Sequence, residues 1–67
     1  MVTLEFHSTE KSQADSKMRV YCNNANELYI NIVYNDDEQM FGHICLDKET
    51  AIKFAKEVRK QISFLED

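Results

Sequence analysis

The most regular hydrophobic pattern in the chain follows Asp47. Apolar residues recur there at steps of three and four, which places them on one stripe of a helix. The stripe comprises Ala51, Phe54, Ala55, Val58, Ile62 and Leu65. The pattern predicts a helix over residues 48–65, and the Asp47 carboxylate is expected to cap it by accepting hydrogen bonds from the first free backbone N–H groups. A lone helix cannot bury this stripe, so the residues before it are expected to cover it.

Four stretches before the helix alternate between apolar and polar residues, as half-buried strands do. These predicted strands cover residues 2–7, 17–22, 27–34 and 39–46. A polar loop over 8–16 separates the first two, and turns rich in Asn or in acidic residues, over 23–26 and 35–38, separate the others. Short connections favour antiparallel neighbours, so the last three strands should form a meander with the first strand at an edge.

The predicted fold is therefore a single α+β domain over residues 1–67. It has two layers, a four-stranded antiparallel meander in β-β-β-β-α order and one C-terminal helix packed on one face. The parity of the alternation also predicts which residues of neighbouring strands lie opposite each other, provided that neither turn contains a bulge. The expected opposed sets are Tyr21, Tyr29 and Cys45; Arg19, Asn31 and His43; and Val33 and Phe41.

The two faces of this predicted sheet differ in character. The even-numbered positions are apolar and are expected to form the core beneath the helix: Val2, Leu4, Phe6, Met18, Val20, Cys22, Leu28, Ile30, Ile32, Met40, Ile44 and Leu46. The odd-numbered positions carry Arg19, Tyr21, Tyr29, Asn31, Val33, Phe41, His43 and Cys45. Since the one predicted helix covers the even face, the odd face is expected to be exposed. An exposed patch of aromatic and apolar residues with arginine is typical of a partner surface.

Three interpretations of the odd face remain open. In the first, the chain forms a homodimer through this face or through an edge strand, because small domains often need additional burial. Phe64, which its helical angle places among the lysines of the outer helix face, would then mark a frayed end or a second contact. In the second, cross-strand aromatic pairs only stabilise the sheet. In the third, single-stranded bases stack on the rings while Arg19 and His43 contact phosphate.

Composition narrows the function classes. A net charge of −4 at pH 7 argues against a general binder of nucleic acid or of anionic membranes. No stretch approaches the ~20 apolar residues that span a bilayer, and the start of the chain lacks the pattern of a signal peptide, so we expect a cytoplasmic protein with no membrane partner. Two cysteines are too few for a disulfide scaffold. One glycine and no proline exclude a glycine-rich phosphate loop.

Residue types suited to catalysis or metal binding are sparse. His43 and Cys45 lie on one face of a predicted strand, but structural zinc sites need four ligands at spacings that this sequence lacks. The acidic run Asp36-Asp37-Glu38 has no calcium-loop pattern around it and is expected to be a solvated turn. We therefore expect no enzymatic activity, no cofactor and no metal.

The end of the last predicted strand and the start of the helix, from Gly42 to Ala51, resemble the end of single-strand-binding transcriptional coactivator domains. Those domains also have four strands and a helix, and they dimerise, so the resemblance implies this fold and a dimer. Counted with the rest of the predicted helix, the resemblance covers about a third of the chain. The chain departs from that family in being acidic and in lacking its basic strand surface, so no binding residue is carried over. The chain also looks like small uncharacterised bacterial proteins, which implies a fold and no activity.

The leading hypothesis is a small non-enzymatic interaction domain that forms a homodimer. The alternative is single-stranded nucleic-acid binding on the aromatic face of the sheet. The expected partner surface comprises Arg19, Tyr21, Tyr29, Asn31, Val33, Phe41, His43 and Phe64.

Overall fold

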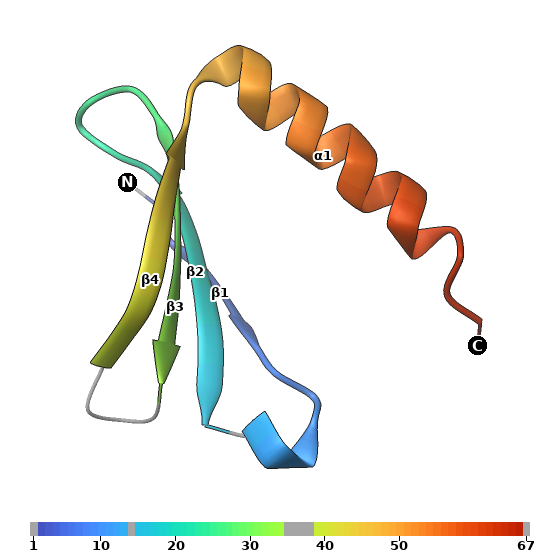
Figure 1. Cartoon of the computed structure of the whole chain (residues 1–67). Helices are drawn as coiled ribbons and strands as arrows, with labels where there is room; N and C mark the ends of the chain where they lie inside the picture. The colour runs from blue at the N-terminus through green and yellow to red at the C-terminus, as the bar shows by residue number, and fades with distance from the viewer. Residues whose placement is uncertain (1, 14, 35–38, 67) are drawn as a thin grey trace.

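The structure is a computed structural model that describes residues 2–13, 15–34 and 39–66, and of residues 39–41 the backbone only. Its elements are β1 (Leu4–His7), a short 3₁₀ turn η1 (Lys11–Gln13), β2 (Ser16–Cys22), β3 (Leu28–Tyr34), β4 (Gln39–Leu46) and α1 (Lys48–Ile62). The strands form one antiparallel sheet in the order β1-β2-β3-β4, followed by the helix (Figure 1). The predicted meander, with the first strand at an edge, is confirmed.

The predicted register holds over most of the sheet. Tyr29 lies opposite Tyr21 on one side and Cys45 on the other, and Asn31 lies between Arg19 and His43 in the same way. These two rows confirm the expected opposed sets.

One predicted pair is wrong, because β4 contains an irregularity. The register shifts between Ile32 and Val33, so that Val33 lies opposite Met40 rather than Phe41. A bulge adds one residue to one strand and reverses the parity beyond it. Met40, which was expected on the even face, therefore stands opposite Val33, a residue of the odd face. The side chains of Met40 and Phe41, and the acidic turn 35–38, lie outside the described residues.

The turn between β2 and β3 forms as its asparagines predict. The side-chain oxygen of Asn23 accepts hydrogen bonds from the backbone N–H groups of Ala25 and Glu27, at 3.0 and 2.9 Å. Asn26 takes a φ of 61°, a left-handed conformation that asparagine tolerates better than most residues. Local side-chain chemistry thus closes this hairpin.

The helix starts where the sequence predicts and ends earlier. The Asp47 carboxylate accepts a 2.8 Å hydrogen bond from the backbone N–H of Thr50. A hydrogen bond with the Thr50 side chain, followed by this backbone bond, holds the pKa of Asp47 below its ordinary value. At the other end the N–H of Ser63 turns back to the carbonyls of Arg59 and Lys60, so α1 ends at Ile62. Within the described residues no helix is long and apolar enough to cross a membrane.

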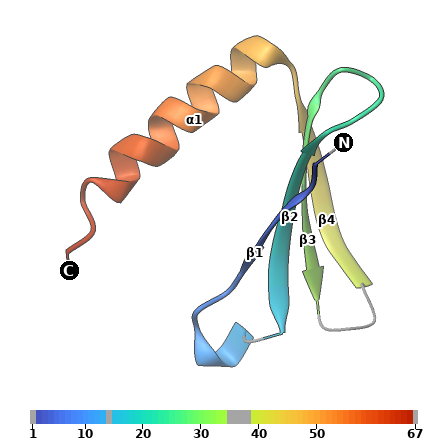
Figure 2. The ribbon, with the colours of Figure 1, turned by 180° about the vertical axis from the view of Figure 1, so that it is seen from behind.

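The helix does not lie on the sheet. In both ribbon views α1 leaves the end of β4 and diverges from the sheet toward its C-terminus (Figures 1 and 2). All residues of α1 are described, and none of them is buried. A single residue, Asp47, separates β4 from α1. The expected helix-on-sheet packing is therefore absent from the single chain.

The expected core on the even face forms at Ile30 but is otherwise largely wrong for one isolated chain. The buried apolar side chains among the described residues are Ile30 and Val33. The even-face residues Ile44 and Phe6 remain 54% and 51% exposed, and Phe54 on the helix stripe is 44% exposed. Because the helix diverges, the sheet and the stripe face each other without closing into a core.

Global dimensions support the same conclusion. The radius of gyration is 13.3 Å, whereas a compact chain of this length would have about 11 Å. The accessible surface is 5868 Å², against about 4400 Å² for a compact monomer of this mass. The chain therefore exposes roughly 1450 Å² more surface than a self-contained domain of its size.

The cap at Asp47 gives a first prediction. Asp47→Ala removes the acceptor for the Thr50 N–H and should lower the helical circular dichroism signal and the melting temperature by a few degrees. Asp47→Asn keeps an acceptor oxygen and should have the smaller effect. Asp15→Ala, which removes an exposed carboxylate far from the helix in sequence, is the control. Equal melting curves for Asp47→Ala and the wild type would show that the cap does not contribute.

Candidate functional site

The odd face of the sheet brings together the aromatic residues that the sequence singled out. The rings of Tyr21 and Tyr29 lie 4.9 Å apart between centroids, tilted by 40°. The imidazole of His43 stacks on Tyr29 at 5.3 Å and 21°. These three rings, which we call the ring ladder, run across β2, β3 and β4. Each ring thus has a ring partner within the chain, as cross-strand stabilisation of the sheet requires.

Two other predicted surface residues are buried. Val33 is 2% exposed, so it is part of the small core and offers no contact surface. Asn31 is 9% exposed, and its Oδ1 atom is buried without a hydrogen-bond partner among the described residues. Lys17, directly opposite Val33 on β2, has a side chain that is only 16% exposed. Long side chains on this face thus lie down along the sheet, as lysine stems often do.

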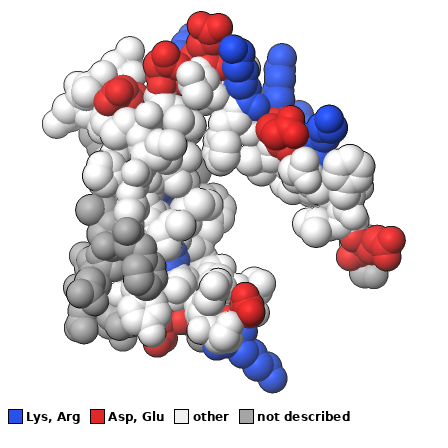
Figure 3. Space-filling view, viewed as in Figure 1, with Lys and Arg blue, Asp and Glu red and all other residues white. Residues whose placement is uncertain are grey.

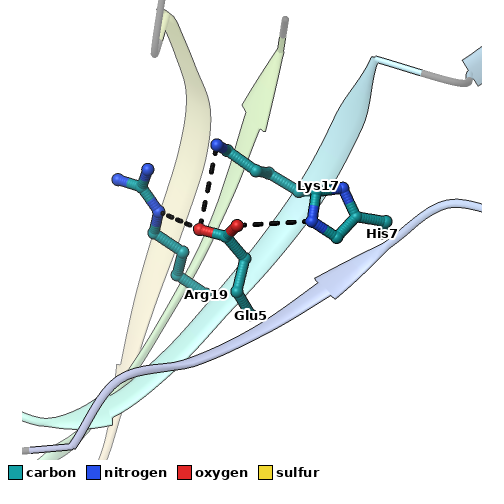
Figure 4. A network of polar contacts seen from close by, with 4 residues as sticks. All are labelled: Glu5, His7, Lys17 and Arg19. Carbon is teal, nitrogen blue, oxygen red and sulfur yellow. Dashed lines mark hydrogen bonds and ion pairs between the residues drawn. The ribbon is translucent and has the colours of Figure 1, made fainter. Parts of the chain in front are cut away.

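A polar cluster at the β1 edge of this face was not predicted from the sequence. Glu5 lies at its centre: Oε2 accepts a 3.0 Å hydrogen bond from Arg19 Nε and lies 3.8 Å from Lys17 Nζ (Figure 4). The other oxygen, Oε1, lies 3.3 Å from Nε2 of His7. Glu5 stands directly opposite Arg19 in the β1–β2 pair. A prediction that paired the first strand with the second in this register would have placed Glu5 beside Arg19.

The cluster changes the electrostatics of the face. The hydrogen bond from Arg19, followed by the charges of Lys17 and Arg19, holds the pKa of Glu5 below its ordinary value, against a smaller opposing effect of desolvation. The carboxylate is therefore ionised at neutral pH and partly neutralises both cations. A phosphate group would have to compete with Glu5 for them.

An open hollow of about 670 Å³ lies beside this cluster. Its lining combines an acid, a cation, a ring and the buried amide: Thr3, Glu5, Arg19, Tyr21 and Asn31. No group of three His, Cys, Asp or Glu side chains within the described residues is arranged to hold a metal ion. Cys22 and Cys45 are both free and exposed, and the Cys45 Sγ lies 3.9 Å from the amide nitrogen of Asn23.

The opposite side of the molecule carries a larger uncovered surface, which we call the apolar cleft. It is the space between the even face of the sheet and the stripe of α1. Near the connection a hollow of about 550 Å³ is lined by Ile30, Ile44, Leu46, Thr50, Lys53, Phe54 and Glu57. In Figure 3 the surface between the sheet and the lower half of the helix is largely white, whereas most charged helix side chains lie along its upper and outer surface.

Phe64 belongs to this cleft rather than to the lysine face. Its predicted position assumed a helix that reaches residue 65, but α1 ends at Ile62 and Phe64 follows in a turn, where its N–H donates to the Gln61 carbonyl. A second hollow of about 480 Å³ is lined by Phe54, Glu57, Val58, Gln61, Ile62, Phe64 and Leu65. The aromatic ring therefore extends the apolar stripe past the end of the helix.

The Glu5 cluster predicts a pH dependence. Because the folded pKa of Glu5 lies below the ordinary value of 4.5, its ion pairs stabilise the fold above that value and are lost as the pH falls through the folded pKa. Glu5→Gln should lower the melting temperature at pH 7 and reduce the further loss on acidification. Glu10→Gln, outside the cluster, should keep the wild-type profile. Parallel melting profiles for Glu5→Gln and the wild type would contradict the role of the cluster.

The two faces therefore offer different chemistry. The odd face has a ring ladder and cations that already contact a carboxylate, whereas the apolar cleft presents exposed apolar side chains such as Ile44 and Phe54. Comparison of the chain with protein-family models, with curated proteins and with solved structures finds no match.

Proposed function

We propose that this chain acts by associating with itself, as a homodimer in which a second copy covers the apolar cleft. The observation that carries the proposal is the uncovered surface. The chain exposes 5868 Å², roughly 1450 Å² more than a compact monomer would. A standard interface buries about 800 Å² per partner, and obligate homodimers bury more. The excess is thus the size of an obligate dimer interface.

The low stability expected for a single chain also supports a second copy as the partner. The buried apolar side chains among the described residues are Ile30 and Val33, a small core for a chain of this length. A helix of 15 residues with few tertiary contacts is also marginal in water. A stable fold therefore requires a partner that buries the cleft, and folding and association are expected to be coupled.

A second copy of the chain fits the cleft because the chain supplies both halves of it. A closed dimer has a two-fold axis, so each surface patch meets the corresponding region of the other copy. The helix stripe of one copy can then cover the even face of the other, and the reverse contact follows by symmetry. The ring ladder and the Glu5 cluster lie on the opposite face of the sheet and remain open in this arrangement.

The proposed role is binding rather than catalysis. His43 stacks on Tyr29, and His7 contacts Glu5, so each described histidine is engaged with a neighbour that is not a nucleophile. An enzyme that uses general base catalysis needs such a base aimed at a nucleophile or at a substrate. The chain is therefore proposed to work as a non-enzymatic interaction domain.

Single-stranded nucleic acid bound to the ring ladder is the second candidate function. The favouring observation is the alignment of Tyr21, Tyr29 and His43 beside Arg19, since bases stack on such rings. The position of Glu5 weakens this candidate, because it draws the cations away from phosphate.

Dimer formation is tested by light scattering over a dilution series. The wild type should have a mass near twice 7.9 kDa. Ile44→Lys and Val58→Glu place charges in the cleft, where Ile44 is 54% and Val58 39% exposed in the single chain, and should abolish the dimer together with most of the folded signal. His43→Lys, on the other face of the same strand, is the matched control and should remain dimeric.

Two results would overturn this proposal. A folded wild-type monomer at micromolar concentration would exclude self-association. A dimer that tolerates both cleft substitutions would place the interface elsewhere.

The second candidate is tested by tyrosine fluorescence. Titration with a single-stranded oligonucleotide should quench the signal in a salt-sensitive way, and Glu5→Gln should bind about tenfold more tightly, because it removes a charge that competes with phosphate. Glu10→Gln is the charge-matched control. A flat titration at low salt, for the wild type and for Glu5→Gln alike, would remove this candidate.

A further inference from the structure

Gly42 has no explanation within its own chain. It is the single glycine of the sequence, and it lies inside β4, opposite Ile32. Its φ is not positive, so its backbone conformation is open to other residues. A Cβ built on Gly42 would meet no atom of the described residues within 4 Å, its two neighbours in the chain left aside. Glycine weakens a strand interior, and where it occurs it often marks a close approach by another backbone.

The neighbouring bulge does not require the glycine either. The register shift lies next to Gly42, between Ile32 and Val33 on the partner strand. The bulge type that depends on glycine places it at a positive φ, a conformation that Gly42 does not adopt.

The position of Gly42 creates a notch in the even face of the sheet. One row of the even face crosses all four strands and consists of Phe6, Met18, Ile32 and Gly42. The first three carry large exposed apolar side chains, and the fourth carries none. The row therefore ends in a notch at the open β4 edge, bounded along the strand by Ile44.

This row is also the part of the cleft that the chain's own helix leaves uncovered. The hollow between sheet and helix is lined by Ile30, Ile44 and Phe54 but does not reach Ile32 or Gly42. The helix diverges from the sheet toward its C-terminus, so its C-terminal half lies away from the sheet (Figures 1 and 2). Among the residues that the structure describes, the row and the C-terminal half of the stripe are thus two apolar surfaces without a covering layer.

We propose that Gly42 is the point where the helix of a second copy comes closest to the sheet. The notch receives an apolar side chain from the C-terminal half of that helix, the half that bears Val58 and Ile62. The missing Cβ lets the helix approach the β4 edge, and the two-fold axis repeats the contact once per chain. This inference rests on the proposed homodimer and adds the site and the orientation of the contact.

Filling the notch is the first test. Gly42→Leu should raise the dimer dissociation constant by about 10- to 100-fold, because overpacking a tight contact pushes the helix away. His43→Leu adds the same side chain to the opposite face of the adjacent position and should change the constant by less than about threefold. Combining Gly42→Leu with Ile62→Ala or with Val58→Ala should recover part of the lost affinity, since one of these changes removes the opposing side chain.

A cross-link keeps the test decisive if Gly42→Leu fails to fold. In a Cys22→Ser, Cys45→Ser background, chains with Gly42→Cys are mixed with chains that carry Val58→Cys or Ile62→Cys, and then oxidised. A covalent heterodimer in either mixture supports the proposal, because a disulfide requires the two Cα atoms to lie within about 7 Å. Its absence from both mixtures overturns it.

The outcomes separate this inference from the proposed function. A wild type that is monomeric at every concentration defeats the homodimer itself. A wild-type dimer whose dissociation constant is the same for Gly42→Leu, His43→Leu and the unsubstituted chain defeats only the contact at Gly42. A disulfide within one chain, in the double variant Gly42→Cys, Ile62→Cys, would show that the helix closes onto its own sheet and would also overturn the inference.

Discussion

The connection at Asp47 constrains the whole molecule. One residue joins β4 to α1, and its carboxylate accepts a hydrogen bond from the Thr50 N–H, so the helix begins directly after the strand. The helix then diverges from the sheet (Figures 1 and 2). Two apolar surfaces of one chain, the even face and the helix stripe, are therefore left largely exposed.

The side chains on the two faces of the sheet are covered in different ways. On the odd face, long side chains cover one another: Tyr29 stacks with Tyr21 and His43, and Glu5 draws Arg19 onto the sheet. Aromatic and ion-paired side chains can cover one face of a sheet without a second layer, because their polar ends still reach water. Aliphatic side chains have no such option. The even face therefore needs a second layer, and a second copy of the chain can supply it.

A homodimer of this kind would give the two faces of the sheet different roles. The apolar cleft would be buried in the dimer interface, and its hydrophobic residues would stabilise the fold. The ring ladder and the Glu5 cluster would face outward, twice per dimer, and would be the surface available to any further ligand. Glu5 would then set the charge of that surface, since it partly neutralises Lys17 and Arg19.

The order of elements, the hairpin at Asn23, the cap at Asp47 and two rows of the register were predictable from the sequence, because they depend on alternation, turn chemistry and short connections. The bulge beside Val33 was not, since one extra residue in β4 leaves no mark on the alternation. The Glu5 cluster was not predictable in the same way, because the long polar loop after the first strand leaves the register of that strand open. Apolar patterning identified the surfaces that must be buried. Only the tertiary structure showed that they remain uncovered within one chain, because the path of the chain after Asp47, rather than the stripe itself, determines whether helix and sheet of one chain can meet.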